Sequence, residues 1–507
     1  MHRLLKILSS KLMWIGPLIL IQLYLYLSIV TGTSHYNGSI DRIFRAIALA
    51  FAIYIINRPS DARYKIAWLL VLLTFPLTGV AIYLLAGNRR VPRKLDRGTV
   101  KANQAMNDLF TQDETAIEQL KIHYPEEEPL FRFGRDYGDF PVYEGTKATY
   151  FSSGEEWVIS FLEDLKSAKH FIFLEYYIVI DGYLWDQVVQ ILQEKVREGV
   201  EIKIIMDDFG SAMLPMSYDK KLWEMGIEVY RFNPLQPALS IKMNNRDHRK
   251  IAVVDNRVAY TGGVNIADEY INHIRRFGYW KDSAIRLEGK AVWSFTCMFL
   301  GLWTYLKKDK KLLQYEKYDL KYVMENDGFF QPFSDTPTDS QNLGLDIHIN
   351  LINCAKKYIY IDSAYLVITD TIRDLLVLAA KRGVDVRILT PHIPDKAWVF
   401  QITRGNYEVL VQAGVKIYEY TPGFNHAKNI VVDDVIGLVG TINTDYRSYF
   451  LHFENGVLFV HRPTALAMRR NFEEAIAKSE WISQEKCKAN IVLRLFRDIL
   501  NLFVPMV

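Results

Sequence analysis

Residues 247–265 read DHRKIAVVDNRVAYTGGVN, and residues 425–443 read NHAKNIVVDDVIGLVGTIN. Both stretches begin with the pattern H-x-K-x4-D, continue through two short apolar runs and end in G-x-x-N. One copy of such a pattern arises by chance with a probability of about 0.04, whereas two copies in corresponding places indicate a duplicated unit. The pair therefore decides both the organisation of the chain and the position of its candidate site.

The similarity between the two stretches extends toward the N-terminal side of each. Residues 161–179, FLEDLKSAKHFIFLEYYIV, correspond to residues 349–367, INLINCAKKYIYIDSAYLV. Residues 197–208, REGVEIKIIMDD, likewise correspond to residues 381–392, KRGVDVRILTPH. Each unit shows a helical pattern and then a short strand, twice in succession. This alternation predicts an α/β fold with mostly parallel sheets covered by helices, in two similar lobes related by approximate twofold symmetry.

The repeat and the changes in composition divide the 507 residues into five parts. The expected parts are an N-terminal membrane anchor with two or three hydrophobic helices at 1–97, a charged linker at 98–145, a first lobe at 146–310, a second lobe at 325–485 and a C-terminal amphipathic helix at 486–507. The last part places apolar residues near one helical face. That pattern fits an interfacial helix and, equally, a helix packed on the core.

The composition describes a folded protein whose charge is unevenly distributed. Hydrophobic residues make up 50% of the chain and charged residues 23%, which excludes intrinsic disorder. The formal net charge is +3, but residues 1–97 hold 13 Lys and Arg against 3 Asp and Glu, so the remainder, with 48 against 55, carries −7. A net acidic main part disfavours a nucleic-acid substrate. Three scattered cysteines are too few for a disulfide framework or a tetrahedral zinc site.

Two uncharged hydrophobic stretches in the N-terminal part are long enough to cross a bilayer. Leu12–Val30 has 19 residues and Ile66–Ala86 has 21, and each would extend about 30 Å as a helix. Ile43–Ile56 is shorter and contains Arg45, so it is a weaker span. A cleaved signal peptide and buried core helices are the alternatives, and the length of the stretches favours a retained anchor. We therefore expect a multi-pass protein of a cell membrane, with its orientation left open by Lys and Arg on both sides of the spans.

The duplicated pattern has the chemistry of a phosphodiester-transfer site. His and Lys separated by one residue on a strand project from the same face, so each histidine stands beside a cation. Two histidines can act as nucleophile and general acid while two lysines neutralise phosphate oxygens. No Asp/Glu cluster for a two-metal site accompanies them, so we expect catalysis without a metal or a cofactor. The candidate catalytic residues are His248, Lys250, Asp255, His426, Lys428 and Asp433, and the candidate phosphate-binding residues are Asn265, Thr441 and Asn443.

The two aspartates of the motifs also have a purely structural interpretation. Asp255 and Asp433 each follow one apolar run and precede another, with Asn256 or Asp434 next in the chain. Asp and Asn are the residues that a hairpin turn favours. A turn between two strands is therefore the alternative to a catalytic role for these residues.

The paired motifs resemble those of the phospholipase D superfamily, and longer stretches resemble bacterial cardiolipin synthases. These stretches include NNRDHRKIAVVD, YTGGVNIADEY, GYWKDSAIRLEG, HAKNIVVD and GTINTDYRSYFLHFE, and the similarity extends from about residue 45 to the C-terminus. The resemblance implies two α/β lobes with one active site between them. It also implies a two-step transfer between two phosphatidylglycerol molecules, which gives cardiolipin and glycerol through a phosphohistidine. The implied partners are membrane phospholipids and no nucleic acid.

The same resemblance implies roles for individual residues. The first motif would supply the nucleophile, His248, and the second the general acid and base, His426, although the near symmetry leaves the reverse order open. Family members orient each histidine with a carboxylate downstream of the motif, and the matching positions are Asp282 and Glu454. Residues 363–370, SAYLVITD, depart from the Pro-Tyr-Phe sequence of many relatives, a change that bears on pocket shape or lipid preference.

Two other functions stay open at this level. A hydrolytic phospholipase D would use the same residues with water in place of the lipid hydroxyl, and only the resemblance favours transfer. A catalytically inactive membrane scaffold would be expected to have lost at least one motif, and both motifs are intact.

Overall fold

The computed structural model describes residues 38–58, 61–87, 91, 93–234, 244–308, 315–325, 328–338 and 341–504. The predicted span Leu12–Val30 lies outside these residues. Contacts divide the chain into two units. One contains the helices that precede Lys94 together with the C-terminal helix, and the other contains both lobes, up to Asn490.

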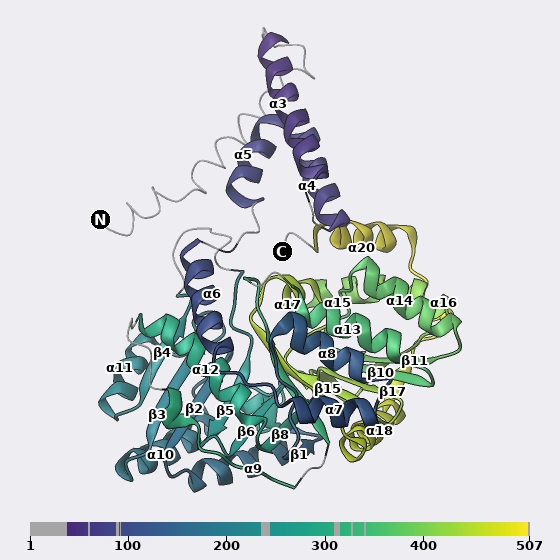
Figure 1. The fold of residues 1–507 in the computed structure, drawn as a ribbon. Helices are drawn as coiled ribbons and strands as arrows, with labels where there is room; N and C mark the ends of the chain where they lie inside the picture. Colours follow the sequence, from purple (N-terminus) through teal and green to yellow (C-terminus); the bar gives the residue numbers. More distant parts are fainter. Residues whose placement is uncertain are drawn as a thin grey trace. The chain divides into compact units, whose positions relative to one another are not determined.

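The first unit consists of four described helices. They are α3 (Gly38–Ile56), α4 (Ala62–Thr74), α5 (Pro76–Ala86) and α20 (Ile491–Phe503) (Figure 1). The prediction of one continuous helix over Ile66–Ala86 is wrong. Pro76 lacks an amide hydrogen and disfavours helical geometry at Phe75, so α4 ends there and α5 begins anew. Among the helices that the structure describes, none combines the length and the apolar character needed to cross a bilayer.

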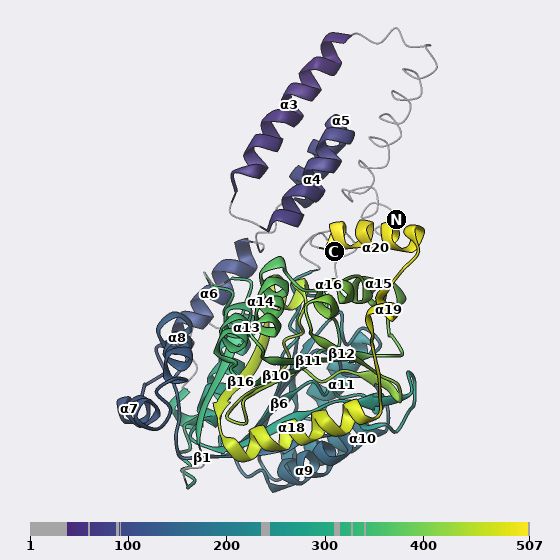
Figure 2. The ribbon, with the colours of Figure 1, turned by 90° about the vertical axis from the view of Figure 1, so that its right-hand side faces the viewer.

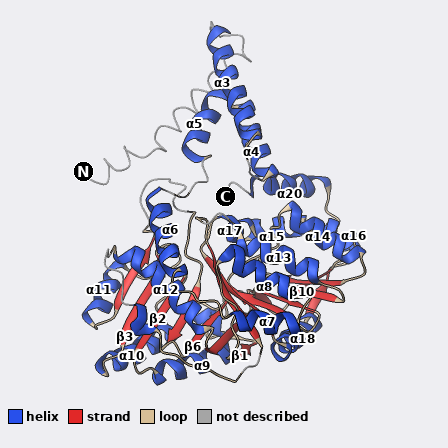
Figure 3. Ribbon diagram, viewed as in Figure 1, coloured by secondary structure: helices blue, strands red, loops and turns tan. Residues whose placement is uncertain are grey.

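The first lobe is built on a seven-stranded sheet of order β1-β8-β6-β5-β2-β3-β4. Its strands are β1 (Thr146–Phe151), β2 (Phe171–Tyr176), β3 (Glu201–Asp207), β4 (Glu228–Phe232), β5 (Lys250–Val254), β6 (Val258–Gly262) and β8 (Ala284–Gly289). Its helices are α9 (Gly154–Ser167), α10 (Tyr183–Arg197), α11 (Met216–Glu224), α12 (Val292–Lys307), η2 (Asp268–Ile271) and η3 (Tyr315–Tyr318). Helices lie on both sides of the strands (Figure 3).

The second lobe repeats this plan around an eight-stranded sheet of order β17-β12-β11-β10-β14-β15-β16-β9. Its strands are β9 (Phe329–Asp335), β10 (Tyr358–Asp362), β11 (Asp385–Pro391), β12 (Lys416–Tyr420), β14 (Asn429–Val432), β15 (Ile436–Gly440), β16 (Glu454–Val460) and β17 (Ser479–Trp481). Its helices are α13 (Leu343–Cys354), α14 (Asp370–Lys381), α15 (Ala397–Gly405), α16 (Tyr407–Gln412), α17 (Tyr446–Phe450), α18 (Arg462–Ala477) and α19 (Gln484–Cys487). Helix α18 packs on β12, β14 and β15 (Figure 2).

Three helices occupy the region before the first lobe. They are α6 (Arg93–Asn107), α7 (Glu114–His123) and α8 (Glu128–Gly138). Helix α8 buries Leu130 and Phe131 and packs against α13 and β9. Gln331 of β9 donates hydrogen bonds to the carbonyl oxygens of Phe131 and Phe140. This part of the expected linker is thereby attached to the second lobe.

Both sheets are mixed, so the expectation of mostly parallel sheets is wrong. In the first lobe, only the β2–β3 and β3–β4 pairs are parallel, and the remaining pairs are antiparallel. The physical reason is the pair of tight turns within the motifs. Asp255 and Asn256 both have positive φ, at 54° and 51°, which is the geometry of a tight hairpin turn, and they lie in the three-residue loop 255–257 that joins β5 to β6. Asp433 and Asp434 do the same between β14 and β15.

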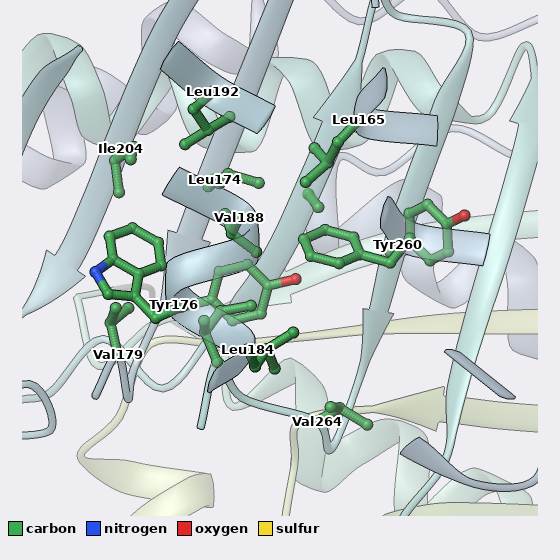
Figure 4. Close-up of a cluster of buried hydrophobic side chains, with 14 of the residues drawn as sticks. Leu165, Leu174, Tyr176, Val179, Leu184, Val188, Leu192, Ile204, Tyr260 and Val264 are labelled. Carbon is green, nitrogen blue, oxygen red and sulfur yellow. The ribbon is translucent and has the colours of Figure 1, made fainter. Parts of the chain in front are cut away.

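The core of the first lobe lies between its sheet and helices α9 and α10. Alternate residues of β2 point to this side, so Leu174 and Tyr176 meet Leu184, Val188 and Leu192 of α10 (Figure 4). On the opposite face of the same strand, Phe173 stacks on Phe299 of α12 at a centroid distance of 4.5 Å. The strand is therefore buried on both sides and forms a rigid support for its neighbour β5.

The main chain of each lobe also pairs with that of the other. Strand β7 (Tyr279–Lys281) lies parallel to β13 (Gly423–Asn425), and together they form a two-stranded sheet between the lobes. In the corresponding place of the other repeat, Asp247 forms a parallel bridge with Phe453. The residue before each motif histidine is thus fixed by the opposite lobe.

Candidate active site

The two motif histidines occupy equivalent positions, two residues before Lys250 at the start of β5 and three before Asn429 at the start of β14. The backbone N–H of His248 donates a 2.8 Å hydrogen bond to the carbonyl oxygen of Phe453, and that of His426 donates a 2.7 Å bond to the carbonyl oxygen of Lys281. Both acceptors belong to the opposite lobe. Each histidine is therefore placed by the residue that immediately precedes the other lobe's candidate carboxylate.

The side chains repeat this crossed arrangement. Nδ1 of His248 lies 2.9 Å from Oε2 of Glu454, and Nδ1 of His426 lies 2.8 Å from Oδ2 of Asp282. Both carboxylates are fully buried, and both histidines are 6% exposed. The two repeats thus exchange carboxylates, and each histidine depends on the opposite lobe for its orientation.

Burial keeps both imidazole rings neutral. It lowers the pKa of His248 well below 6.5 and the pKa of His426 to about 4, despite the opposing effect of the carboxylates. Burial would raise the pKa of Asp282, but hydrogen-bonded His426 holds it below its ordinary value. An ionised carboxylate only accepts hydrogen bonds, so the ring proton resides on Nδ1. Nε2 of each ring is left with a lone pair, as a nucleophile or a general base requires.

The two motif lysines bring positive charge to the same place. Nζ of Lys250 donates a 2.7 Å hydrogen bond to the carbonyl oxygen of His248, and Nζ of Lys428 donates to that of His426. Burial lowers the pKa of Lys250 to about 7 and that of Lys428 to about 8. The charge of Lys428 contributes to the lowered pKa of Lys250, so the lysines of the two motifs are close enough to repel each other. A phosphate anion would compensate this paired charge.

Asp255 and Asp433 lie at the ends of β5 and β14 that are remote from the histidines, in the turn position that was the alternative to a catalytic role. The carboxylate of Asp255 accepts hydrogen bonds from the backbone N–H groups of Lys169, His170 and Phe171. Asp433 accepts three equivalent bonds from the main chain at residues 356–358. The physical reason for their occurrence in both motifs is structural, because each ties a hairpin turn to the start of the neighbouring strand.

The candidate phosphate-binding residues have three different surroundings. Oδ1 of Asn265 accepts from the backbone N–H of Ile178, and its Nδ2 donates to the hydroxyl of Tyr270. The hydroxyl of Thr441 donates to Oε2 of Glu454. Oδ1 of Asn443 is buried without a hydrogen-bond partner among the described residues. The side chains of Asn265 and Thr441 therefore bond to other residues around the site. Asn443 keeps an amide oxygen that has no hydrogen-bond partner among the described residues.

Several side chains around the histidines were not predicted from the sequence. Tyr177 contacts the ring of His248 edge to face at 5.0 Å, and Trp280 contacts that of His426 at 5.1 Å. Nε1 of Trp280 also donates to Oδ2 of Asp282 at 3.2 Å. His452 lies 5.4 Å from the ring of His248. The position of His452 two residues before Glu454 was visible in the sequence, but no motif gave it meaning.

Two groups among the described residues have the composition of a metal site. One is His248, His452 and Glu454, and the other is His392, Glu419 and Glu480. In the second group, Arg404 donates to both carboxylate oxygens of Glu419, at 2.9 and 2.7 Å. The positive charge of Arg404 therefore already compensates Glu419, one of the two carboxylates in the second group.

Family comparisons match both lobes and the N-terminal part. The family described as cardiolipin synthase, PLD-like domain, matches residues 161–280 and 348–476, one segment in each lobe. The family described as phospholipase D-nuclease N-terminal matches residues 46–88. Of the solved structures, phosphatidylserine synthase of Haemophilus influenzae resembles the chain with a TM-score of 0.57 at 14% identity, covering 75% of this chain and 97% of that one. This last likeness concerns the fold.

Individual relatives are similar over most of their length. An uncharacterized protein of Streptococcus mutans is 38% identical over 456 residues, or 90% of this chain and 99% of the relative. A cardiolipin synthase of Alkalihalophilus pseudofirmus is 35% identical over 419 residues, or 82% and 83%. A cardiolipin synthase of a Geobacillus species is 34% identical over 464 residues, or 91% and 92%. With this identity over nearly whole chains, the protein belongs to the bacterial cardiolipin synthase family of the phospholipase D superfamily and is a phosphatidyltransferase.

Proposed function

We propose that the protein transfers the phosphatidyl group of one phosphatidylglycerol to a second, giving cardiolipin and glycerol through a phosphohistidine. The crossed pairs His248–Glu454 and His426–Asp282 carry this proposal, because they support two neutral imidazoles at one junction of the lobes. Relatives named cardiolipin synthase supply the substrate class.

In the first half-reaction, Nε2 of His248 attacks the phosphorus atom of the donor lipid. The P–O bond to glycerol breaks, and protonated His426 gives its proton to the departing oxygen. The anionic phosphodiester raises the pKa of the nearby rings, which allows His426 to hold that proton once substrate is bound. Lys250 and Lys428 stabilise the charge that develops on the non-bridging oxygens.

In the second half-reaction, neutral His426 accepts the proton of a hydroxyl on the second phosphatidylglycerol. The resulting oxygen attacks the phosphorus atom, and the P–N bond to His248 breaks. The ring of His248 leaves in its neutral form with the proton on Nδ1, held by Glu454. The low pKa that burial imposes on His248 supports its assignment as nucleophile, because Nε2 stays unprotonated.

Hydrolysis is the competing outcome for the same intermediate. Near-complete burial of the four paired side chains favours transfer, because a site that is closed to solvent limits attack by water. Vesicles of phosphatidylglycerol test the proposal. The full chain is expected to release glycerol and to accumulate cardiolipin in chelator-treated buffer, whereas phosphatidic acid as the main product would contradict transfer.

We also propose that the protein acts at a membrane, where its lipid substrates reside. Helix α20 supports this, since five of its apolar residues are exposed: Ile491, Val492, Leu495, Phe496 and Ile499. Arg494 and Arg497 belong to the same helix. An amphipathic helix with basic residues suits the interface of a membrane that contains anionic lipids.

A further inference from the structure

His452 is a buried histidine that the proposed reaction does not use. It is 8% exposed, and neither ring nitrogen makes a hydrogen bond within the described part of the chain. Its Nδ1 lies 3.4 Å from Oε1 of Glu454, the carboxylate that orients His248. Buried polar nitrogens normally have partners, and a second imidazole beside the carboxylate that holds His248 supplies the donor atoms that a metal ion would take.

The donor atoms of this set lie close enough together to share one small divalent ion, although His248 and Glu454 are at hydrogen-bond distance rather than at the spacing of metal ligands. One donor atom of each of the three residues lies within 4.8 Å of the other two. Nδ1 of His248 is 3.0 Å from Oε1 of Glu454, and Nδ1 of His452 is 3.4 Å from the same oxygen. Zinc bonds to nitrogen and oxygen are about 2.0 to 2.2 Å, so ligands of a tetrahedral zinc ion lie about 3.3 to 3.6 Å apart.

We propose that His248, His452 and Glu454 form an inhibitory binding site for Zn²⁺. Two imidazoles and one carboxylate are a zinc donor set, whereas Mg²⁺ and Ca²⁺ prefer oxygen ligands alone. A fourth ligand, such as one water molecule, would complete the tetrahedron. The group around His392 is not such a site, because Arg404 pairs with Glu419 and Lys486 with Glu480.

Zinc binding changes the tautomer of His248. The ion takes the lone pair of Nδ1, so the ring proton moves from Nδ1 to Nε2 and the ring stays neutral. Nε2–H has no lone pair with which to attack phosphorus, so the first half-reaction stops. This inhibition rests on the proposed function, but the metal site itself does not.

Zinc affinity of the purified full chain, measured by competition with a chromophoric chelator, tests the site directly. His452→Asn is expected to weaken zinc binding by at least about 100-fold, since it removes a ligand, and the matched variant His392→Asn is expected to bind as the unsubstituted protein does. Equal affinity in His452→Asn and the unsubstituted protein would overturn the site. Co²⁺ bound to the unsubstituted protein provides a measurement without any variant: intense visible absorption supports a tetrahedral site, and the weak spectrum of an octahedral ion contradicts it.

Glycerol release from phosphatidylglycerol vesicles tests the inhibition. Zn²⁺ is expected to stop release by the unsubstituted protein, a chelator to restore it, and His452→Asn to lose its sensitivity to Zn²⁺ relative to its own metal-free rate. Zinc binding through His452 without any effect on the rate would overturn the inhibitory role. A protein that binds zinc in this way yet makes no cardiolipin in metal-free buffer would instead contradict the proposed function.

Discussion

His248 and Glu454 are 206 positions apart in the sequence and belong to different lobes, yet Nδ1 of the ring lies 2.9 Å from the carboxylate. His426 and Asp282 form the reverse pair at 2.8 Å. Neither lobe therefore contains both a motif histidine and the carboxylate that orients it. Duplication of the fold and assembly of the site are inseparable in this chain, and an isolated lobe would lack an oriented nucleophile.

Glu454→Gln is expected to lower the rate of cardiolipin formation by about 10⁴-fold, the scale seen when a buried carboxylate that fixes a catalytic tautomer becomes an amide. The amide can donate to Nδ1 of His248, which favours the proton on Nε2 and removes the nucleophilic lone pair. Initial rates in phosphatidylglycerol vesicles measure the effect. The surface variant Glu163→Gln is a control that should retain the full rate, and a loss below tenfold in Glu454→Gln would contradict this tautomer role.

His426→Ala is expected to form a phosphatidyl-enzyme on His248 slowly and then to retain it, because the first half-reaction lacks its general acid, the second lacks its general base, and the nucleophile is intact. Mass spectrometry of peptides quenched at alkaline pH locates the modification. His248→Ala should give no covalent species. If His248→Ala accumulates an adduct on His426 instead, the two histidines exchange roles.

Asp255→Ala is expected to destabilise the protein by about 3 kcal/mol, because three backbone N–H groups lose their acceptor. Asp433→Ala should cost less, since two of the three N–H groups it binds are in exposed surroundings, whereas Asp255 itself is 3% exposed. Thermal unfolding in detergent measures both losses. The activity of the remaining folded protein should be unchanged at low temperature, and a chemical defect without loss of stability would return the aspartates to the catalytic machinery.

The sequence predicts much of this architecture because duplication is visible in residue patterns. The repeat around His248 and His426 predicts two similar lobes, and the family resemblance points to Asp282 and Glu454. The exchange of carboxylates between lobes could not be predicted, because it depends on how two folded sheets dock rather than on local spacing. His452 was missed for the same reason, since its significance arises only where it meets Glu454.

Two errors had local causes that the sequence did contain. The turn residues Asp255 and Asn256 indicate a hairpin, and a hairpin requires antiparallel strands, so the sheet had to be mixed. Pro76 likewise interrupts a long apolar stretch that hydropathy alone treats as continuous. In both places, the backbone preference of one or two residues outweighed the average character of their surroundings: proline restricts φ, and Asp and Asn tolerate positive φ.

Cardiolipin formation is expected to lose kcat/KM as the pH rises through about 7 to 8. Burial lowers the pKa of Lys250 to about 7 and that of Lys428 to about 8, so both cations are present below these values and are lost above them. A bound phosphodiester raises both pKa values, so kcat should persist to higher pH than kcat/KM. Initial rates across the pH range give both profiles. A kcat/KM that stays constant up to about pH 10 would contradict the role of the lysines.

Helix α20 is expected to insert its apolar residues into vesicles that contain phosphatidylglycerol. Leu495 is 60% exposed, and its burial among lipid chains would remove apolar surface from water. A polarity-sensitive dye on Leu495→Cys should shift to shorter wavelength in these vesicles and be quenched by nitroxide-labelled lipid. The same dye on Ile159→Cys, an exposed position of α9 in the first lobe, is the matched control and should not be quenched. A helix that lies in the membrane interface brings the dye at position 495 within reach of the lipid label and leaves the dye at position 159 in water. Equal quenching at both positions, or at neither, would therefore contradict a specific membrane contact of α20.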